Sequence, residues 1–235
     1  MKIIYLIIFS VIICLTAPSS FAGEGHASPY FNFPKSYETW DYKFLAGIGI
    51  TKLPTNIVEE EINTSPVAFA DFRLDLPWNF TTDLYIATNY ISNIGTLSIQ
   101  ANLINSFVSF SPGIRGSMWF GHVEMESIKL KSYGMLIKPF VSAGIDFGDV
   151  MLTGTLEMQF GNMYTYSEDS LLAKFSQPRS GYTLRFTLEQ PLFGNTWVLL
   201  GLGLNYATFY YQSWLSYSAI RQYLFYPEIY FGFIL

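Results

Sequence analysis

The 235-residue chain contains few charges and almost no cysteine or histidine. Charged residues make up 13% of it, and there are one cysteine and two histidines. The charged fraction is about half that of an average soluble domain. Since phosphate groups are bound by clustered Lys and Arg, the formal net charge of −5 argues against a nucleic-acid partner. With 50% hydrophobic residues, the chain is expected either to face lipid or to bury an unusually large core.

The first 22 residues have the features of a secretory signal peptide. Lys2 supplies a positive charge, residues 3–15 are apolar, and a small-x-small cleavage site lies just before Gly23. An uncleaved anchor helix is the alternative, although the apolar stretch is short for a bilayer span. Cys14 is the only cysteine, so cleavage leaves a mature chain without disulfides or a cysteine nucleophile.

The rest of the chain lacks any apolar run close to the roughly 20 residues of a membrane helix. Apolar and polar residues alternate instead, most clearly in 66–76, 149–161 and 181–190. Segments of about ten alternating residues are typical of tilted strands in an outer-membrane barrel, where closure pairs every backbone group. A soluble β-sandwich has the same alternation, but the low charge and 18% aromatic content favour lipid.

Turn-forming residues and longer polar connections alternate along the chain. Short turns are predicted at 77–79, 111–113, 146–149 and 191–195, and longer loops at about 52–65, 92–96, 124–132, 163–179 and 211–221. The predicted fold is all-β: a closed, antiparallel, up-and-down transmembrane barrel of about ten strands over residues 41–235, with eight or twelve as alternatives. Pro139 cannot donate to a ladder, so its strand is expected to begin later or to carry a bulge.

The last residues alternate up to the end of the chain, with Ile229, Phe231, Phe233 and Leu235 on one face. This alternation resembles the C-terminal assembly signature of Gram-negative outer-membrane β-barrel proteins, except that Leu235 stands where Phe is commonest. The signal peptide predicts export through the general secretory pathway, and the resemblance implies a place in the bacterial outer membrane. It also implies three partners: the barrel assembly machinery, outer-membrane lipid and lipopolysaccharide.

Inward-facing positions of the predicted strands carry charges of both signs. The predicted lumen network consists of Asp71, Arg73, Asp75, Arg115, Glu157, Arg185 and Glu189. The same alternation places Asp83, Lys138 and Glu228 on the inner wall. Because buried charges must be paired, we interpret these residues mainly as a structural ion-pair network and secondarily as the lining of a narrow pore. A wide porin is not expected, since large aqueous channels have about sixteen strands or more.

Two further features concern the barrel's ends. Residues 23–40 precede the first strand without a clean period and could lie in the periplasm, cap the lower mouth or enter the lumen. Aromatic side chains near the proposed strand ends predict interfacial girdles; they include Tyr42, Trp78, Phe80, Tyr90, Phe110, Phe147, Trp197, Tyr206, Phe209, Tyr210, Tyr211 and Tyr223.

No residue constellation predicts catalysis, a metal site or a cofactor. His122 is the one weak catalytic candidate, but His122-Val123-Glu124 lacks the nearby serine that a lipid A deacylase would use. An omptin-like protease would need its aspartates near the outer rim, whereas Asp71, Asp75 and Asp83 are expected in the middle of the barrel or at its periplasmic end.

Three functional hypotheses follow. The first is a non-enzymatic outer-membrane barrel that acts as a narrow pore or uptake channel, or as a structural or surface protein. The second is a membrane-embedded lipid A or peptide hydrolase, and the third is a soluble periplasmic β protein. The oligomeric state is left open.

Overall fold

The computed structural model describes residues 30–36, 38–55, 63–125, 128–167, 170–193, 196–208, 211–212 and 222–235. The predicted signal peptide at 1–22 and the first residues of the 23–40 segment lie outside these ranges, as do Phe209 and Tyr210. No helix within the described ranges is long and apolar enough to cross a membrane.

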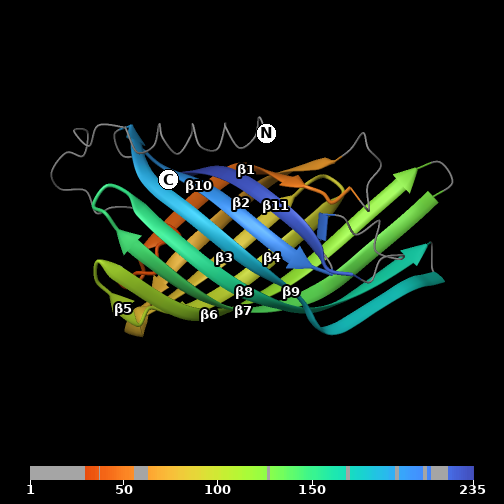
Figure 1. Cartoon of the computed structure of the whole chain (residues 1–235), viewed down its shortest axis with the longest axis horizontal. Coiled ribbons are helices and arrows are strands. Elements are labelled where there is room, and N and C mark those ends of the chain that lie inside the picture. The colour runs from red at the N-terminus through yellow and green to blue at the C-terminus, as the bar shows by residue number, and fades with distance from the viewer. Residues whose placement is uncertain are drawn as a thin grey trace.

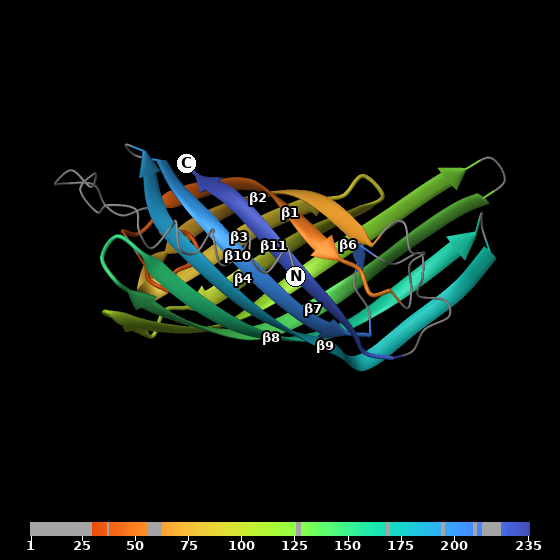
Figure 2. The same cartoon turned by 45° about the horizontal axis from the view of Figure 1, so that its top comes forward.

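The described residues form a single sheet that closes on itself (Figures 1 and 2). Its strands are β1 (Tyr42–Lys52), β2 (Thr64–Leu76), β3 (Phe80–Thr88), β4 (Ser92–Ala101), β5 (Ile104–Asn105), β6 (Val108–Met125), β7 (Ile128–Asp146), β8 (Met151–Ser167), β9 (Ser170–Phe193), β10 (Thr196–Ala207) and β11 (Leu224–Ile234). All neighbours are antiparallel, β1 pairs with β11, and β4 pairs with β6. Because β5 has only two residues, the ring has ten long strands, and the predicted barrel is confirmed.

Each long strand has an apolar face and a more polar face. In β1, the outward Ile48 and Ile50 are 67% and 57% exposed, whereas the inward Lys43 and Thr51 are buried. The same holds on β4, where Leu97 is exposed and Ser98 is buried. This is the reverse of a soluble protein, in which polar residues face outward. A sandwich of two packed sheets is therefore wrong for this chain.

Successive connections lie at opposite ends of the barrel. The turn end has the 3₁₀ turn η2 (Pro77–Asn79), the connection at 102–107 that contains β5, the turn at 147–150, the short link from β9 to β10, and the last residue, Leu235. The other end, here called the loop end, has the connections that leave β1, β3, β6, β8 and β10. The predicted turns at 77–79 and 146–149 are therefore close to the observed ones.

Several predicted boundaries are wrong. Residues 111–113 lie inside β6, paired with 140–142 of β7, and the connection falls at 102–107. Residues 92–96 belong to β4, and the connection before it is 89–91. Much of the predicted loops at 124–132 and 163–179 is strand, because β6 to β9 contain 18, 19, 17 and 24 residues. A bilayer requires only about 9–11 residues per strand, so these strands extend well beyond that length.

Pro139 is tolerated in a different way from the one predicted. β7 runs through it without a shift in register towards β6, where it lies opposite Ile114. On the other side, pairing with β8 stops after Ile137 and resumes at Phe140. The missing N–H thus interrupts one ladder locally, while the strand neither starts late nor carries a bulge.

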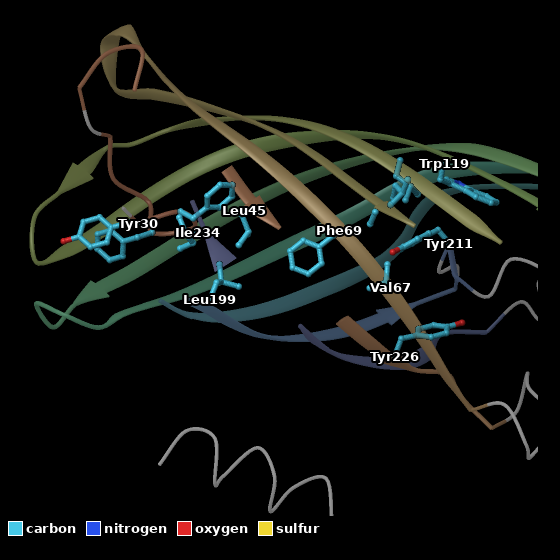
Figure 3. Close-up of a cluster of buried hydrophobic side chains, with 14 of the residues drawn as sticks. Tyr30, Leu45, Val67, Phe69, Trp119, Leu199, Tyr211, Tyr226 and Ile234 are labelled. Carbon is cyan, nitrogen blue, oxygen red and sulfur yellow. The ribbon is translucent and has the colours of Figure 1, made fainter. Parts of the chain in front are cut away.

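Apolar side chains also line part of the inner wall (Figure 3). Leu45, Val67, Phe69, Leu199 and Ile234 are buried there, on β1, β2, β10 and β11. Trp197 and Tyr211, predicted in the girdles, are instead buried and belong to this cluster. Trp197 falls on the inward side of the β10 alternation. The girdle prediction fits better at Tyr42, Trp78, Tyr90, Phe147 and Tyr206, whose side chains are exposed.

Candidate functional site

The segment before β1 enters the lumen at the turn end. Residues 30–36, here called the N-terminal plug, contain Phe31 and Phe33, which are 2% and 0% exposed. Tyr30 packs edge-on against Trp197, with ring centroids 6.1 Å apart. Of the three placements left open by the sequence, residues 30–36 therefore occupy the lumen, whereas residues 38–40 are exposed.

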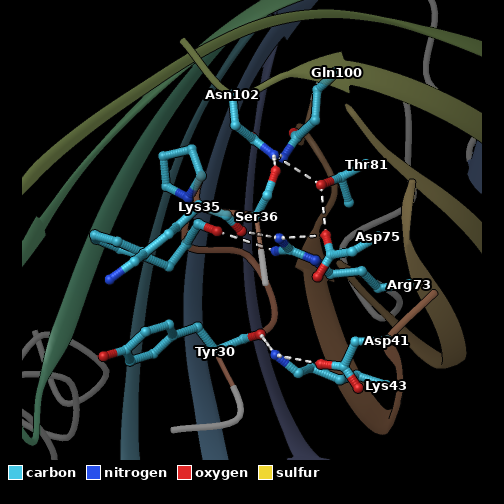
Figure 4. Close-up of polar contacts among 12 residues, drawn as sticks. Tyr30, Lys35, Ser36, Asp41, Lys43, Arg73, Asp75, Thr81, Gln100 and Asn102 are labelled. Atoms are coloured by element: carbon cyan, nitrogen blue, oxygen red, sulfur yellow. Dashed lines mark hydrogen bonds and ion pairs between the residues drawn. The ribbon is translucent and has the colours of Figure 1, made fainter. Parts of the chain in front are cut away.

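Charged side chains of the wall hold the main chain of the plug (Figure 4). The Arg73 guanidinium donates hydrogen bonds to the carbonyl oxygens of Phe31, Phe33 and Lys35, and pairs with Asp75 at 3.2 Å. Because the plug forms no ladder, these contacts replace the hydrogen bonds that its buried backbone would otherwise lack.

Two further charged residues, Glu189 and Lys43, bind the main chain of the plug; together with Arg73 they are here called the clamp. The Glu189 carboxylate accepts the backbone N–H groups of Phe31, at 3.0 Å, and Asn32, at 2.5 Å. The Lys43 ammonium donates to the carbonyl oxygen of Tyr30 at 3.1 Å and lies 3.8 Å from Asp41. Acceptors and donors of the plug backbone are thus matched by side chains from β1, β2 and β9.

Side-chain contacts fix the position of the plug in the ring. Asn102 donates a hydrogen bond to the Ser36 hydroxyl at 2.6 Å, and the Tyr30 hydroxyl donates to Asp146 at 3.2 Å. Phe33 lies against Gly144 of β7, where an added Cβ would come within 2.6 Å of the ring. The missing side chain at 144 therefore makes room for the plug.

A second charged group lies on the wall formed by β6 to β9. Glu157 is 1% exposed and pairs with Arg115 and, at 3.6 Å, with Arg185. The Arg115 guanidinium also lies 4.2 Å from the centre of the Phe140 ring. The seven predicted network residues thus form two groups: Arg73, Asp75 and Glu189 at the plug, and Arg115, Glu157 and Arg185 on this wall. Asp71 belongs to neither.

A cavity of about 100 Å³ lies in the lumen beside the plug, with Asn32 on its surface. Asp71, Arg115, Glu157 and Arg185 line it, together with Asp83, Lys138 and Glu228. The alternation of the sequence assigned all these residues to the inner wall. It could not show that they surround one cavity, because they come from seven different strands.

The weak catalytic candidate lies away from the lumen. His122 falls on the outward side of β6, is half exposed, and has its Nε2 atom 3.8 Å from Glu124. Lys129 also contacts Glu124, at 2.5 Å. Neither contact provides the serine that nucleophilic catalysis would need. Within the described ranges, no group of three or more His, Cys, Asp or Glu side chains could hold a metal ion.

The residues of the predicted assembly signature form the outer face of the closing strand. Phe231 and Phe233 pack edge to face with ring centroids 4.9 Å apart, and Leu235 is 73% exposed. Leu235 and Phe44 exchange backbone hydrogen bonds of 2.8 and 3.3 Å, which join the end of the chain to β1.

The closed ring with its apolar outer face defines a β-barrel protein, and solved barrels resemble it at low identity. The outer-membrane protease OmpT from Escherichia coli shares 12% identity, with 83% of this chain and 92% of that chain covered and a TM-score of 0.45. The translocator domain of the autotransporter NalP from Neisseria meningitidis shares 10% identity, with 82% and 86% covered and a TM-score of 0.44. No protein-family model and no curated protein matches the sequence.

Proposed function

We propose that this chain is an integral outer-membrane barrel without catalytic activity, and that its lumen is a narrow pore closed at rest by the N-terminal plug. The turn end would face the periplasm and the loop end the outside. The observation that carries the proposal is the plug itself, held inside a polar lumen by Arg73, Glu189 and Lys43.

The outer face supports a place in lipid. Large apolar side chains are exposed around the ring, among them Ile48, Ile86, Leu97, Met118 and Ile137. A soluble monomer rarely exposes a continuous apolar patch of more than a few hundred Å². Exposed Trp78 and Phe147 at the turn end, with Tyr90 and Tyr206 at the loop end, fit the two interfacial girdles of such a barrel.

The inside of the barrel supports a narrow and closed passage. Barrels of this size are largely filled by side chains, and here the plug adds buried rings at the turn end. The contacts between residues 30–36 and the wall are hydrogen bonds and not covalent bonds. The plug can therefore move out of the lumen while the barrel stays closed. A purely structural barrel would have the same outer face but would need no removable closure.

The position of His122 supports a role without catalysis. Its ring lies on the outer face, beside Glu124 and Lys129, and the charged residues of the lumen lie on the other side of the wall. A hydrolase that used His122 would have to assemble its nucleophile on that outer face.

Single-channel recording in planar bilayers tests the proposal. The mature chain should be mostly silent, whereas Arg73→Gln and Glu189→Gln, which weaken the clamp, should open in discrete steps at least ten times more often. Lys131→Met is the matched control, because this exposed side chain lies on the outer face of β7. Silence of both clamp variants, in proteins that insert normally, would contradict a pore and leave the structural role.

A further inference from the structure

The basic residues around the cavity lie on one side of the lumen, with one acidic residue among them. The basic residues Arg115, Lys138 and Arg185 come from β6, β7 and β9 and surround Glu157 of β8. Asp71 and Asp83 come from β2 and β3. In the closed order β1-β2-β3-β4-β6-β7-β8-β9-β10-β11, β2 and β8 are five strands apart in both directions. The acidic and basic walls therefore face one another across the lumen.

Each wall has buried polar atoms that form no hydrogen bond with the described residues. The Oδ1 atom of Asp71, the Nε atom of Arg185 and the Tyr230 hydroxyl are buried without a hydrogen-bond partner among the described residues. All three side chains line the cavity. Within the same ranges, the Lys138 ammonium forms no hydrogen bond or ion pair. Buried polar groups normally have partners, so these atoms call for a polar occupant.

The charges that line the cavity restrict the kind of molecule that it can hold. The cavity is lined by three bases and four acids, which are Asp71, Asp83, Glu157 and Glu228. A simple anion would meet a lining that is negative overall, and a simple cation would meet the three bases on one wall. A small molecule that carries both charges can satisfy the two walls together.

The size of the cavity fits a small solute. Its volume is about 100 Å³. One water molecule requires roughly 10–15 Å³ of such space, so the cavity has room for several waters or one small molecule.

We infer that this cavity is a binding site for a small zwitterion of the amino-acid class. Lys138 and Arg185 would receive its carboxylate, Asp71 its ammonium group, and the Tyr230 hydroxyl would bind beside them. The inference rests on the proposed pore, because it names the solute that would occupy the lumen next to the plug.

Calorimetric titration of the folded, detergent-solubilised mature chain tests this site. The probes are L-alanine, propionate, which lacks the amine, and ethylamine, which lacks the carboxylate. L-alanine should bind at least tenfold more tightly than either half-molecule. Asp71→Asn and Lys138→Met should each weaken L-alanine binding at least tenfold, and Lys131→Met should not change it.

A milder variant keeps the test valid if the charge substitutions prevent folding. Tyr230→Phe removes only the unpartnered hydroxyl and should weaken L-alanine binding about threefold to tenfold. Equal affinity for the three probes, or no binding of any of them, would show that the cavity holds only water and would overturn the inference. Failure of the outer-membrane proposal would look different, since the chain would then not insert into bilayers at all.

Discussion

At the scale of single residues, Glu157 is a buried acid between two arginines. Its buried carboxylate compensates Arg115 and Arg185, and Lys138 lines the same cavity. Removing one partner of a buried ion pair costs about 3–5 kcal/mol, because the remaining charges stay buried without compensation. Glu157→Gln should therefore lower the free energy of unfolding by about that amount, measured by urea titration in detergent.

The control for this substitution lies on the outer face of the same barrel. Glu124 also has a basic partner, Lys129, but both side chains are about half exposed. Exposed ion pairs contribute little to stability. Glu124→Gln should leave the unfolding midpoint unchanged, and an equal shift in the two variants would contradict the role assigned to Glu157.

The second prediction at the residue scale concerns Gly144. A Cβ at this position would lie 2.6 Å from Phe33 and 2.9 Å from Pro34 of the plug, so Gly144→Ala should push the plug out of place. We expect a severalfold rise in channel opening and faster proteolysis near residue 33. The matched control is Gly154→Ala on β8, where the nearest atom beyond the chain neighbours is 3.7 Å away. Equal behaviour of the two variants would count against the position of the plug.

At the scale of elements, the plug can be tested by cross-linking. The mature chain is predicted to lack cysteine, so introduced pairs can be assayed without background. Ser36→Cys combined with Asn102→Cys replaces two side chains that are 2.6 Å apart. A short bifunctional thiol reagent should link them in isolated membranes and shift the band on a gel. Ser36→Cys with Asn93→Cys, on the outer face of β4, should remain unlinked; equal linking of both pairs would argue against a fixed plug.

The faces of the strands could be predicted from the sequence, but some of their boundaries could not. A period of two assigns inward and outward residues correctly in 66–76, in 151–159 of the predicted strand 149–161, and in 181–190, because lipid and lumen impose opposite polarity on alternate residues. The turn expected at 111–113 is wrong for a local reason. β4 pairs with β6 only as far as Gly113, so Pro112 lies where the strand is unpaired on that side and a missing N–H costs little.

At the scale of the whole molecule, the lumen was only partly predictable. The charged residues of the wall follow from alternation, but the contacts between them and the plug do not, since Phe31 and Glu189 are 158 residues apart. The plug itself has no period and no pairing, so its position depends on tertiary contacts that a single sequence does not reveal.

The central claim is that the apolar outer face of a closed ring meets hydrocarbon. Gel mobility of the purified mature chain in SDS, with and without boiling, tests it most directly. We expect the unboiled protein to run as a compact, faster band and the boiled protein to run as a slower, unfolded one. One band of unchanged mobility, from a chain that stays folded and monomeric in buffer without detergent, would contradict the claim.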